Sequence, residues 1–116
     1  MATSIIPNPN QYETTTLGTS SYTGNITYHK GMVTKYDNAR AHIELSCKST
    51  TDIPTNVQIA SVPEGYRPKS DSYLPAIMAS SSGWFAGNVK VGSNGVISQG
   101  LTGYMREVVV DGWYNI

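Results

Sequence analysis

The feature that most constrains the fold is a two-residue period in hydrophobicity that runs along the chain from Asn25 onward. The stretch "HIELSCKS" shows this period without interruption. Successive side chains of a β-strand point to opposite faces, so the stretch predicts a strand with Ile43, Leu45 and Cys47 turned inward. Its outward positions are His42, Glu44 and Ser46. Since no window of a dozen residues has a sustained helical period, we predict an all-β fold.

Turn signals separate the alternating stretches at the spacing of roughly 8–12 residues that is typical of an antiparallel sandwich or barrel. Asn94-Gly95, between "WFAGNVKV" and "GVISQ", predicts a tight hairpin. Asp111-Gly112, between "YMREVVV" and "WYNI", predicts a second one. The stretches "NITYHKG" and "MVTKYDN" alternate around Gly31 and predict a further short hairpin.

The chain has 116 residues, which corresponds to one domain. Residues 1–24 are rich in Pro, Asn, Thr, Ser and Gly and are predicted to form an extended arm, which can pack on a neighbouring copy. Residues 25–116 are predicted to form the folded head. Within the apolar run "SYLPAIMAS", Pro75 predicts an edge strand or a bulge.

Charge and composition exclude several classes of partner. Eight basic residues balance eight acidic ones, so nothing indicates binding to nucleic acid or to anionic membranes. No apolar run approaches the roughly 20 residues of a membrane span, and "MATSIIPNPNQ" lacks the regions of a signal peptide. Only 14% of residues are charged, which favours either a surface for uncharged partners such as glycans or an ordinary solvated β surface.

Catalytic and metal-binding patterns are weak in this sequence. The only histidines, His29 and His42, lack metal-ligand spacing, so we expect no metal and no cofactor. Cys47 is the only cysteine, which excludes an intrachain disulfide and favours a buried structural thiol. The carboxylates are scattered, and neither a G-x-S-x-G elbow nor a phosphate-binding loop occurs. We therefore expect no enzymatic activity.

Aromatic residues are the remaining candidates for a site, because flat rings stack on the apolar faces of sugars. Trp84 follows the serine-rich loop 80–83 and is the preferred ligand-binding candidate. Tyr104 and Arg106 are weaker candidates, and packing in the core or at an interface is the alternative for any single ring. The aromatic residues considered are Tyr22, Tyr28, Tyr36, Tyr66, Tyr73, Trp84, Phe85, Tyr104, Trp113 and Tyr114.

The stretch "SVPEGYRPKSDSYLPA" is unusually rigid for a loop. Proline and glycine at the second and fourth positions of Val62–Gly65 suit a type I turn. A proline also forces the residue before it into an extended conformation, so the exit from the turn is fixed. We interpret the segment as a structural corner and expect any binding surface to lie elsewhere. The residues of this structural turn are Pro63, Gly65, Tyr66, Arg67 and Pro68.

The segments "NVQIASVPEGYRPKSDSYLPA", "GNVKVGSNGVI" and "VVVDGWYNI" resemble the C-terminal domains of tail-fibre, baseplate and receptor-binding proteins of tailed phages and prophages. Those domains share an "A-x-[LV]-P-x-G-Y-R-P" segment followed by a short apolar strand, a hairpin and a closing strand. The resemblance covers roughly residues 41–116. Its "PEGYRP" motif corresponds to Pro63–Pro68 and carries over as structural only.

The resemblance implies an antiparallel β-sandwich head of jelly-roll type, in a homotrimer at the distal end of a fibre. It also implies attachment to a bacterial surface saccharide, contacts with other tail or baseplate proteins, and a place in the virion exposed to the medium. The protein would then be made in the host cytoplasm without a signal peptide. The alternatives are a purely structural virion module, such as a fibre cap or baseplate accessory, and a small carbohydrate-active enzyme.

Overall fold

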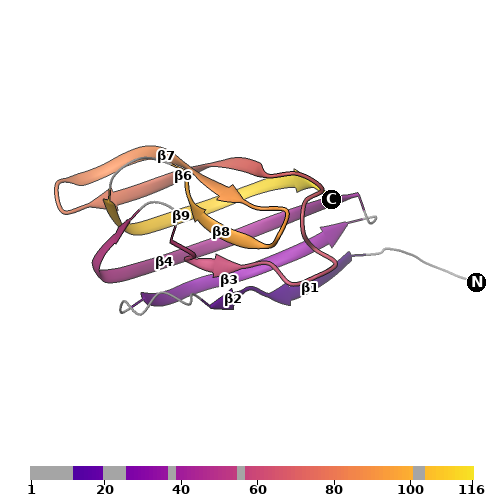
Figure 1. Ribbon diagram of the computed structural model, residues 1–116. Helices are drawn as coiled ribbons and strands as arrows, with labels where there is room; N and C mark the ends of the chain where they lie inside the picture. Colours follow the sequence, from indigo (N-terminus) through magenta and orange to yellow (C-terminus); the bar gives the residue numbers. More distant parts are fainter. Residues whose placement is uncertain (1–11, 20–25, 37–38, 55–56, 101–103) are drawn as a thin grey trace, which may run out of the picture.

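The computed structural model describes residues 12–19, 26–36, 39–54, 57–100 and 104–116, and these contain β-strands and no helix (Figure 1). The prediction of an all-β, antiparallel fold is confirmed. No helix in the described ranges is long and apolar enough to cross a membrane. The strands are β1 (Tyr12–Thr16), β2 (Gly18–Thr19), β3 (Ile26–Tyr36), β4 (Arg40–Pro54), β5 (Ala60–Ser61), β6 (Ser72–Ser80), β7 (Gly83–Val91), β8 (Val96–Gln99) and β9 (Tyr104–Asn115).

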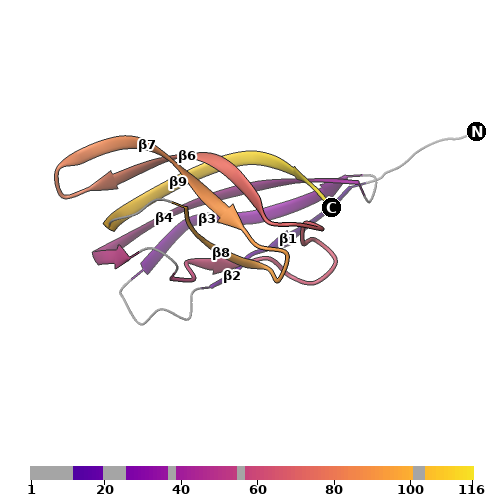
Figure 2. The same ribbon diagram turned by 45° about the horizontal axis from the view of Figure 1, so that its top comes forward.

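All of these strands belong to one sheet, in the order β1-β3-β4-β9-β6-β7-β8-β5-β2. Figures 1 and 2 show that the sheet curls into a half-barrel, so that β8 and β5 face the strands at its other end. Because the hydrogen bonds run through the whole sheet, the two-layered jelly-roll sandwich is not confirmed. The homotrimer stays a prediction.

The two ends of the sheet are joined by the chain itself at Leu17. Before this residue β1 pairs with β3, and after it β2 pairs with β5. Leu17 is buried, and its N–H donates to the carbonyl of Gly31 at 2.9 Å. A Cβ on Gly18 would lie 2.2 Å from Oγ of Ser61, so a larger residue at this crossing would require the Ser61 side chain to rotate. Residues 12–19 are therefore part of the sheet, although the sequence assigned them to the arm.

The core fills the inside of the half-barrel, and the predicted alternation along β4 is confirmed. Ile43, Leu45 and Cys47 are each at most 1% exposed, whereas His42, Glu44 and Ser46, which alternate with them, lie on the outer side. β4, β6 and β9 each contribute several buried side chains, whereas β3 contributes only Val33. The largest fully buried side chains are Ile43, Leu45, Ile53, Ile59, Met78, Ile97, Met105, Val33, Val62, Val89, Val91 and Val108.

The hairpin predicted at Asn94-Gly95 is confirmed. β7 and β8 pair antiparallel on either side of it, and the N–H of Gly95 donates to the carbonyl of Gly92 at 2.8 Å. Gly95 has a φ of +91°, which explains the need for glycine. The hairpin predicted around Gly31 is wrong, because β3 runs through this residue. A register shift between Tyr28 and Lys30 interrupts the pairing with β4 but does not reverse the chain.

The hairpin predicted at Asp111-Gly112 is also wrong. β9 passes straight through these residues, and they pair with Glu44 and Ile43 of β4. Continuous pairing along a long strand outweighs the local preference of an Asp-Gly dipeptide for a turn. Pro75 does not mark an edge strand, because β6 has β7 on one side and β9 on the other. The pairing with β9 begins only at the residue after Pro75, and the pairing with β7 shows no bulge.

Candidate functional site

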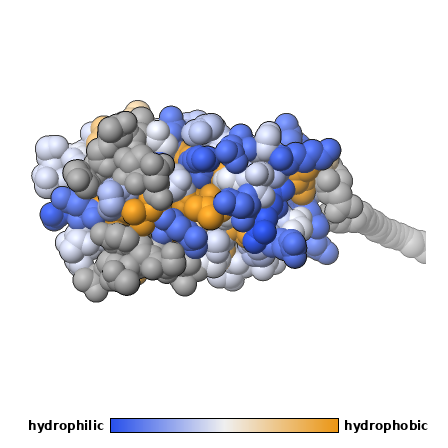
Figure 3. Space-filling view, viewed as in Figure 1, coloured by the Kyte–Doolittle hydropathy of each residue, from blue (hydrophilic) through white to orange (hydrophobic). Residues whose placement is uncertain are grey.

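Most of the large apolar side chains that are exposed to solvent lie on the outer face of three adjacent strands, β9, β6 and β7. These side chains are between 37% and 59% exposed, and they belong to Tyr73, Ile77, Trp84, Val109 and Trp113. The side of the molecule that carries β8 and β5 is mostly hydrophilic, with small separate apolar spots (Figure 3). Exposed apolar side chains gathered on one face mark an interaction surface. The outer face of β9, β6 and β7 is therefore the main candidate.

One end of this face carries a group of aromatic and charged side chains that we call the Trp113 cluster. His42 lies opposite Trp113 in the pairing of β4 with β9, and their ring centroids are 4.7 Å apart. The ring of Tyr36 is 5.1 Å from that of Trp113, and the guanidinium of Arg40 lies 5.1 Å from the same centroid. Nε2 of His42 lies 2.6 Å from Oδ1 of Asp111. The Trp113 cluster consists of these five residues.

The Trp113 cluster combines a flat apolar surface with hydrogen-bonding groups. The indole of Trp113 is 48% exposed, so part of its surface is free to contact a ligand. Arg40 supplies guanidinium donors and a cation that interacts with the ring, and Asp111 supplies carboxylate acceptors. A sugar ring presents an apolar face bordered by hydroxyl groups that both donate and accept. The cluster therefore has the chemistry that a saccharide ligand needs.

The middle of the outer face is apolar and slightly hollowed. Ile77 of β6 lies between Ala86 of β7 and Val109 of β9 in the register of the sheet. Together with Pro75 they line a shallow hollow of about 370 Å³, at whose margin Asp111 supplies a charge. This middle surface suits apolar side chains of a protein partner better than a sugar, because it offers few hydrogen-bonding groups.

Trp84, the preferred candidate from the sequence, is 59% exposed on the same face. It lies near the tip of the β6–β7 hairpin, opposite Ala79, and Ala79 in turn lies opposite Glu107 of β9. Trp113 is six residues farther along β9 than Glu107, which is a distance of about 20 Å along a strand. Trp84 and the Trp113 cluster therefore occupy opposite ends of the face.

The other two candidates lie toward the same end of the sheet as Trp84. Arg106 is exposed, and its Nε lies 2.7 Å from Oδ1 of Asp52, so the guanidinium already has a carboxylate partner. Tyr104 begins β9 opposite Pro54. Its side chain lies outside the described residues. The structure thus places Arg106 and Tyr104 away from the Trp113 cluster.

The proline-rich corner forms a turn one residue later than the sequence predicted. The N–H of Tyr66 donates to the carbonyl of Pro63 at 3.1 Å, so the turn comprises residues 63–66. Gly65, its third residue, has a φ of +93°. A type II turn needs a positive φ at this position, which a type I turn does not. The type I turn predicted at Val62–Gly65 is therefore wrong.

Hydrogen bonds tie the corner to two other parts of the fold. Nε of Arg67 donates to the carbonyl of Val62 at 2.9 Å, and the N–H of Val62 donates to the carbonyl of Gly95 at 2.8 Å. The hydroxyl of Tyr114 in β9 donates to the carbonyl of Tyr66 at 2.6 Å. Burial raises the pKa of the Tyr114 hydroxyl above its usual range. Pro68 is buried at the end of the corner.

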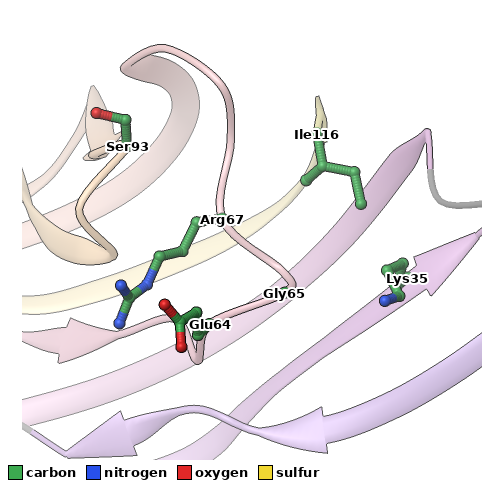
Figure 4. Close-up of a pocket in the computed structure, with 6 residues that line it drawn as sticks. All are labelled: Lys35, Glu64, Gly65, Arg67, Ser93 and Ile116. Carbon is green, nitrogen blue, oxygen red and sulfur yellow. The ribbon is translucent and has the colours of Figure 1, made fainter.

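A pocket of about 410 Å³ opens beside this corner at one end of the half-barrel (Figure 4). We call it the end pocket. From the sequence we expected any binding surface to lie away from the corner, whereas the corner supplies three of the residues that line this pocket. The lining residues are Lys35, Glu64, Gly65, Arg67, Ser93 and Ile116.

Cys47 is buried, as predicted. Burial, with a smaller contribution from the negative charge of Glu107, raises the pKa of the thiol to about 12. The thiol therefore stays protonated at neutral pH and is a poor nucleophile. Within the described ranges, no three His, Cys, Asp or Glu side chains gather closely enough to hold a metal ion.

Sequence reasoning missed the Trp113 cluster, although a partial signal was present. Arg40 and His42 are two residues apart, as are Asp111 and Trp113, so each pair shares one face of its strand. The sequence did not show that the two strands are neighbours, nor in which register. In comparisons with known proteins, no family model and no curated protein matches this chain.

Proposed function

We propose that the chain is the head or tip domain of a tailed-phage tail-fibre, baseplate or receptor-binding protein, and that it binds a bacterial surface saccharide without catalysing a reaction. The resemblance of residues 41–116 supports the phage origin. The observation that carries the binding role is the half-exposed indole of Trp113, with Arg40 and Asp111 beside it. In this proposal the domain belongs to the virion, faces the medium and contacts other tail proteins.

The Trp113 cluster is suited to binding because its groups are held before a ligand arrives. His42 contacts both the ring of Trp113 and the carboxylate of Asp111, which restricts both side chains. Little side-chain entropy is then lost on binding. In the proposed complex a sugar stacks on the indole while Arg40 donates to its hydroxyl groups. The remaining lone pairs of Asp111 accept from them.

The homotrimer is part of the same proposal, and the apolar middle of the outer face supports it. Ile77 is 56% exposed beside Val109 and Ala86, and contact with a second copy would remove this surface from water. Light scattering on the purified protein should give the mass of a trimer. Ile77→Lys should shift it toward the monomer, whereas Ser70→Lys, at an exposed position in the loop before β6, should not. A monomeric wild-type protein would contradict this part of the proposal.

A purely structural virion module is the second candidate, because the same apolar surface favours contact with protein. In that case Trp113 and Trp84 would be covered by neighbouring subunits. Trp113→Ala would then weaken assembly, measured by light scattering, and the wild-type protein would not bind cells.

The deciding experiment measures binding to bacterial cells and to purified surface polysaccharide. Trp113→Ala should weaken binding at least about tenfold, because the sugar would lose the ring on which it stacks. Phe85→Ala is the matched control, because Phe85 is also an exposed aromatic residue but faces away from Trp84 on the hairpin. Trp84→Ala tests the candidate from the sequence in the same assay.

Equal binding by Trp113→Ala and the wild-type protein would overturn the assignment of the site. The chain length of the polysaccharide should stay constant during incubation. A decrease would indicate a carbohydrate-active enzyme instead.

A further inference from the structure

We infer that the end pocket is a second binding site, separate from the Trp113 cluster, and that it takes a single uncharged sugar unit. The inference deepens the proposed function and rests on it, because it also supposes a saccharide ligand. It concerns different residues, however, and can be tested independently. Three features of the pocket support the inference: its shape, the rigidity of its walls and the balance of its charges.

The walls of the end pocket come from distant parts of the chain. Lys35 belongs to β3, Glu64 and Arg67 to the corner, Ser93 to the β7–β8 turn, and Ile116 follows β9. Figure 4 shows Arg67, Glu64 and Ser93 on one side of the pocket and Lys35 and Ile116 on the other. The volume of about 410 Å³ lies within the range of roughly 300–1,000 Å³ found for small-molecule sites.

The cationic groups of the pocket are held in place by the fold. Nε of Arg67 donates to the carbonyl of Val62, which leaves the terminal amino groups of the guanidinium for a ligand. Nζ of Lys35 lies 5.1 Å from the centroid of the Tyr66 ring and 3.6 Å from Oε1 of Glu13. A ligand therefore meets donors whose positions are already set, which reduces the entropy lost on binding.

The charges around the pocket cancel. Lys35, Arg67 and Glu64 line the pocket, and the carboxylate of Glu13, 3.6 Å from Nζ of Lys35, balances the second positive charge from outside the lining. A pocket for an anion would have a surplus of positive charge, as phosphate and carboxylate sites do. This pocket instead offers strong donors and strong acceptors together, and each sugar hydroxyl can use both. The side chain of Ile116 and the bare backbone of Gly65 give the sugar ring apolar contact.

The test is an NMR titration of the full chain with single sugars. Glucose, galactose, rhamnose and N-acetylglucosamine are the neutral probes, and sodium glucuronate is the anionic probe. At least one neutral sugar should shift the backbone amide signals of Glu64, Gly65, Arg67 and Ser93 at millimolar concentration. If none of them shifts these signals up to tens of millimolar, the inference is overturned.

Two variants separate a neutral ligand from an anionic one. For a neutral sugar, Glu64→Ala and Lys35→Met should each weaken binding, by roughly fivefold to tenfold for a lost charged hydrogen bond. Lys69→Met is the matched control, because Lys69 is an exposed lysine next to the corner but does not line the pocket. Arg67 is left unchanged because it supports the corner.

If glucuronate binds more tightly than the neutral sugars, and Glu64→Ala strengthens its binding, the pocket is an anion site and the inference is wrong. The result of this titration is independent of the cell-binding test of the proposed function. If Trp113→Ala leaves binding to cells unchanged, the proposed site is wrong, but a single sugar can still bind the end pocket. Equally, cell binding can depend on Trp113 while the end pocket stays empty.

Discussion

The side chain of Arg67 occupies the space that any side chain at Gly95 would need. A Cβ on Gly95 would lie 2.4 Å from Nε of Arg67 and 2.7 Å from the carbonyl oxygen of Val62. The corner and the β7–β8 turn therefore fit together only because Gly95 is a glycine. Since Arg67 also lines the end pocket, this contact links the stability of the fold to the shape of a candidate site.

Gly95→Ala should destabilise the protein strongly, and Gly65→Ala is its matched control. Both glycines have a φ near +90°, so alanine costs about 1–2 kcal/mol of backbone strain at either position. Only at Gly95 does the new methyl group also collide with other atoms. We expect Gly95→Ala to lower the free energy of unfolding by about 1–3 kcal/mol more than Gly65→Ala. Urea denaturation measures the difference, and equal losses would contradict the close packing.

Tyr114→Phe should lower the free energy of unfolding by about 1–2 kcal/mol. The hydroxyl of Tyr114 donates to the carbonyl of Tyr66. Because Tyr114 is only 5% exposed, water cannot easily replace the hydroxyl as the donor to this carbonyl. Tyr73→Phe is the control, because Tyr73 is 59% exposed and should tolerate the change. A thermal unfolding series of both variants checks this, and similar melting temperatures for the two would argue against it.

Gly112→Ala should be neutral or stabilising by up to about 1 kcal/mol. Gly112 lies within β9, and a Cβ there would contact Leu74 at an ordinary distance of 3.6 Å. Alanine also reduces the conformational entropy of the unfolded chain. A tight Asp-Gly turn, as the sequence suggested, would need a positive φ and would make the same change destabilising. Denaturation of this single variant therefore distinguishes a continuous β9 from a hairpin.

The stability of the protein should fall as the pH rises above the ordinary pKa of a thiol. Burial raises the pKa of Cys47 from 9.0 to about 12 in the folded state, so the unfolded chain loses this proton first. This contribution to stability is complete below pH 9.0 and decreases toward pH 12, by up to about 1.4 kcal/mol per pH unit.

Cys47→Ala should remove this part of the slope, measured by urea denaturation between about pH 8 and 10, below the ordinary pKa of tyrosine. In the same range, the native thiol should react with iodoacetamide only after unfolding. An unchanged slope in Cys47→Ala would show that the thiol has no part in it.

Local patterns predicted the strand faces well and the turns unevenly. The alternation around Leu45 is a property of neighbouring residues, and burial followed it. The Asn94-Gly95 turn was correct because its residues favour the geometry by themselves. Asp111-Gly112 carried the same kind of signal, but its flanks pair continuously with β4. The strand pairing thus decided between two dipeptides that look equivalent in the sequence.

The sequence by itself determined that this chain forms strands, which faces those strands bury and that Cys47 is inside. Each of these depends on residues a few positions apart. Only the tertiary structure decided that Leu17 joins the two ends of the sheet, that Arg40 meets Trp113, and that the corner borders a pocket. Those relationships depend on strand order and register, which come from the summed pairing and packing of segments far apart in the chain. No short stretch contains that information.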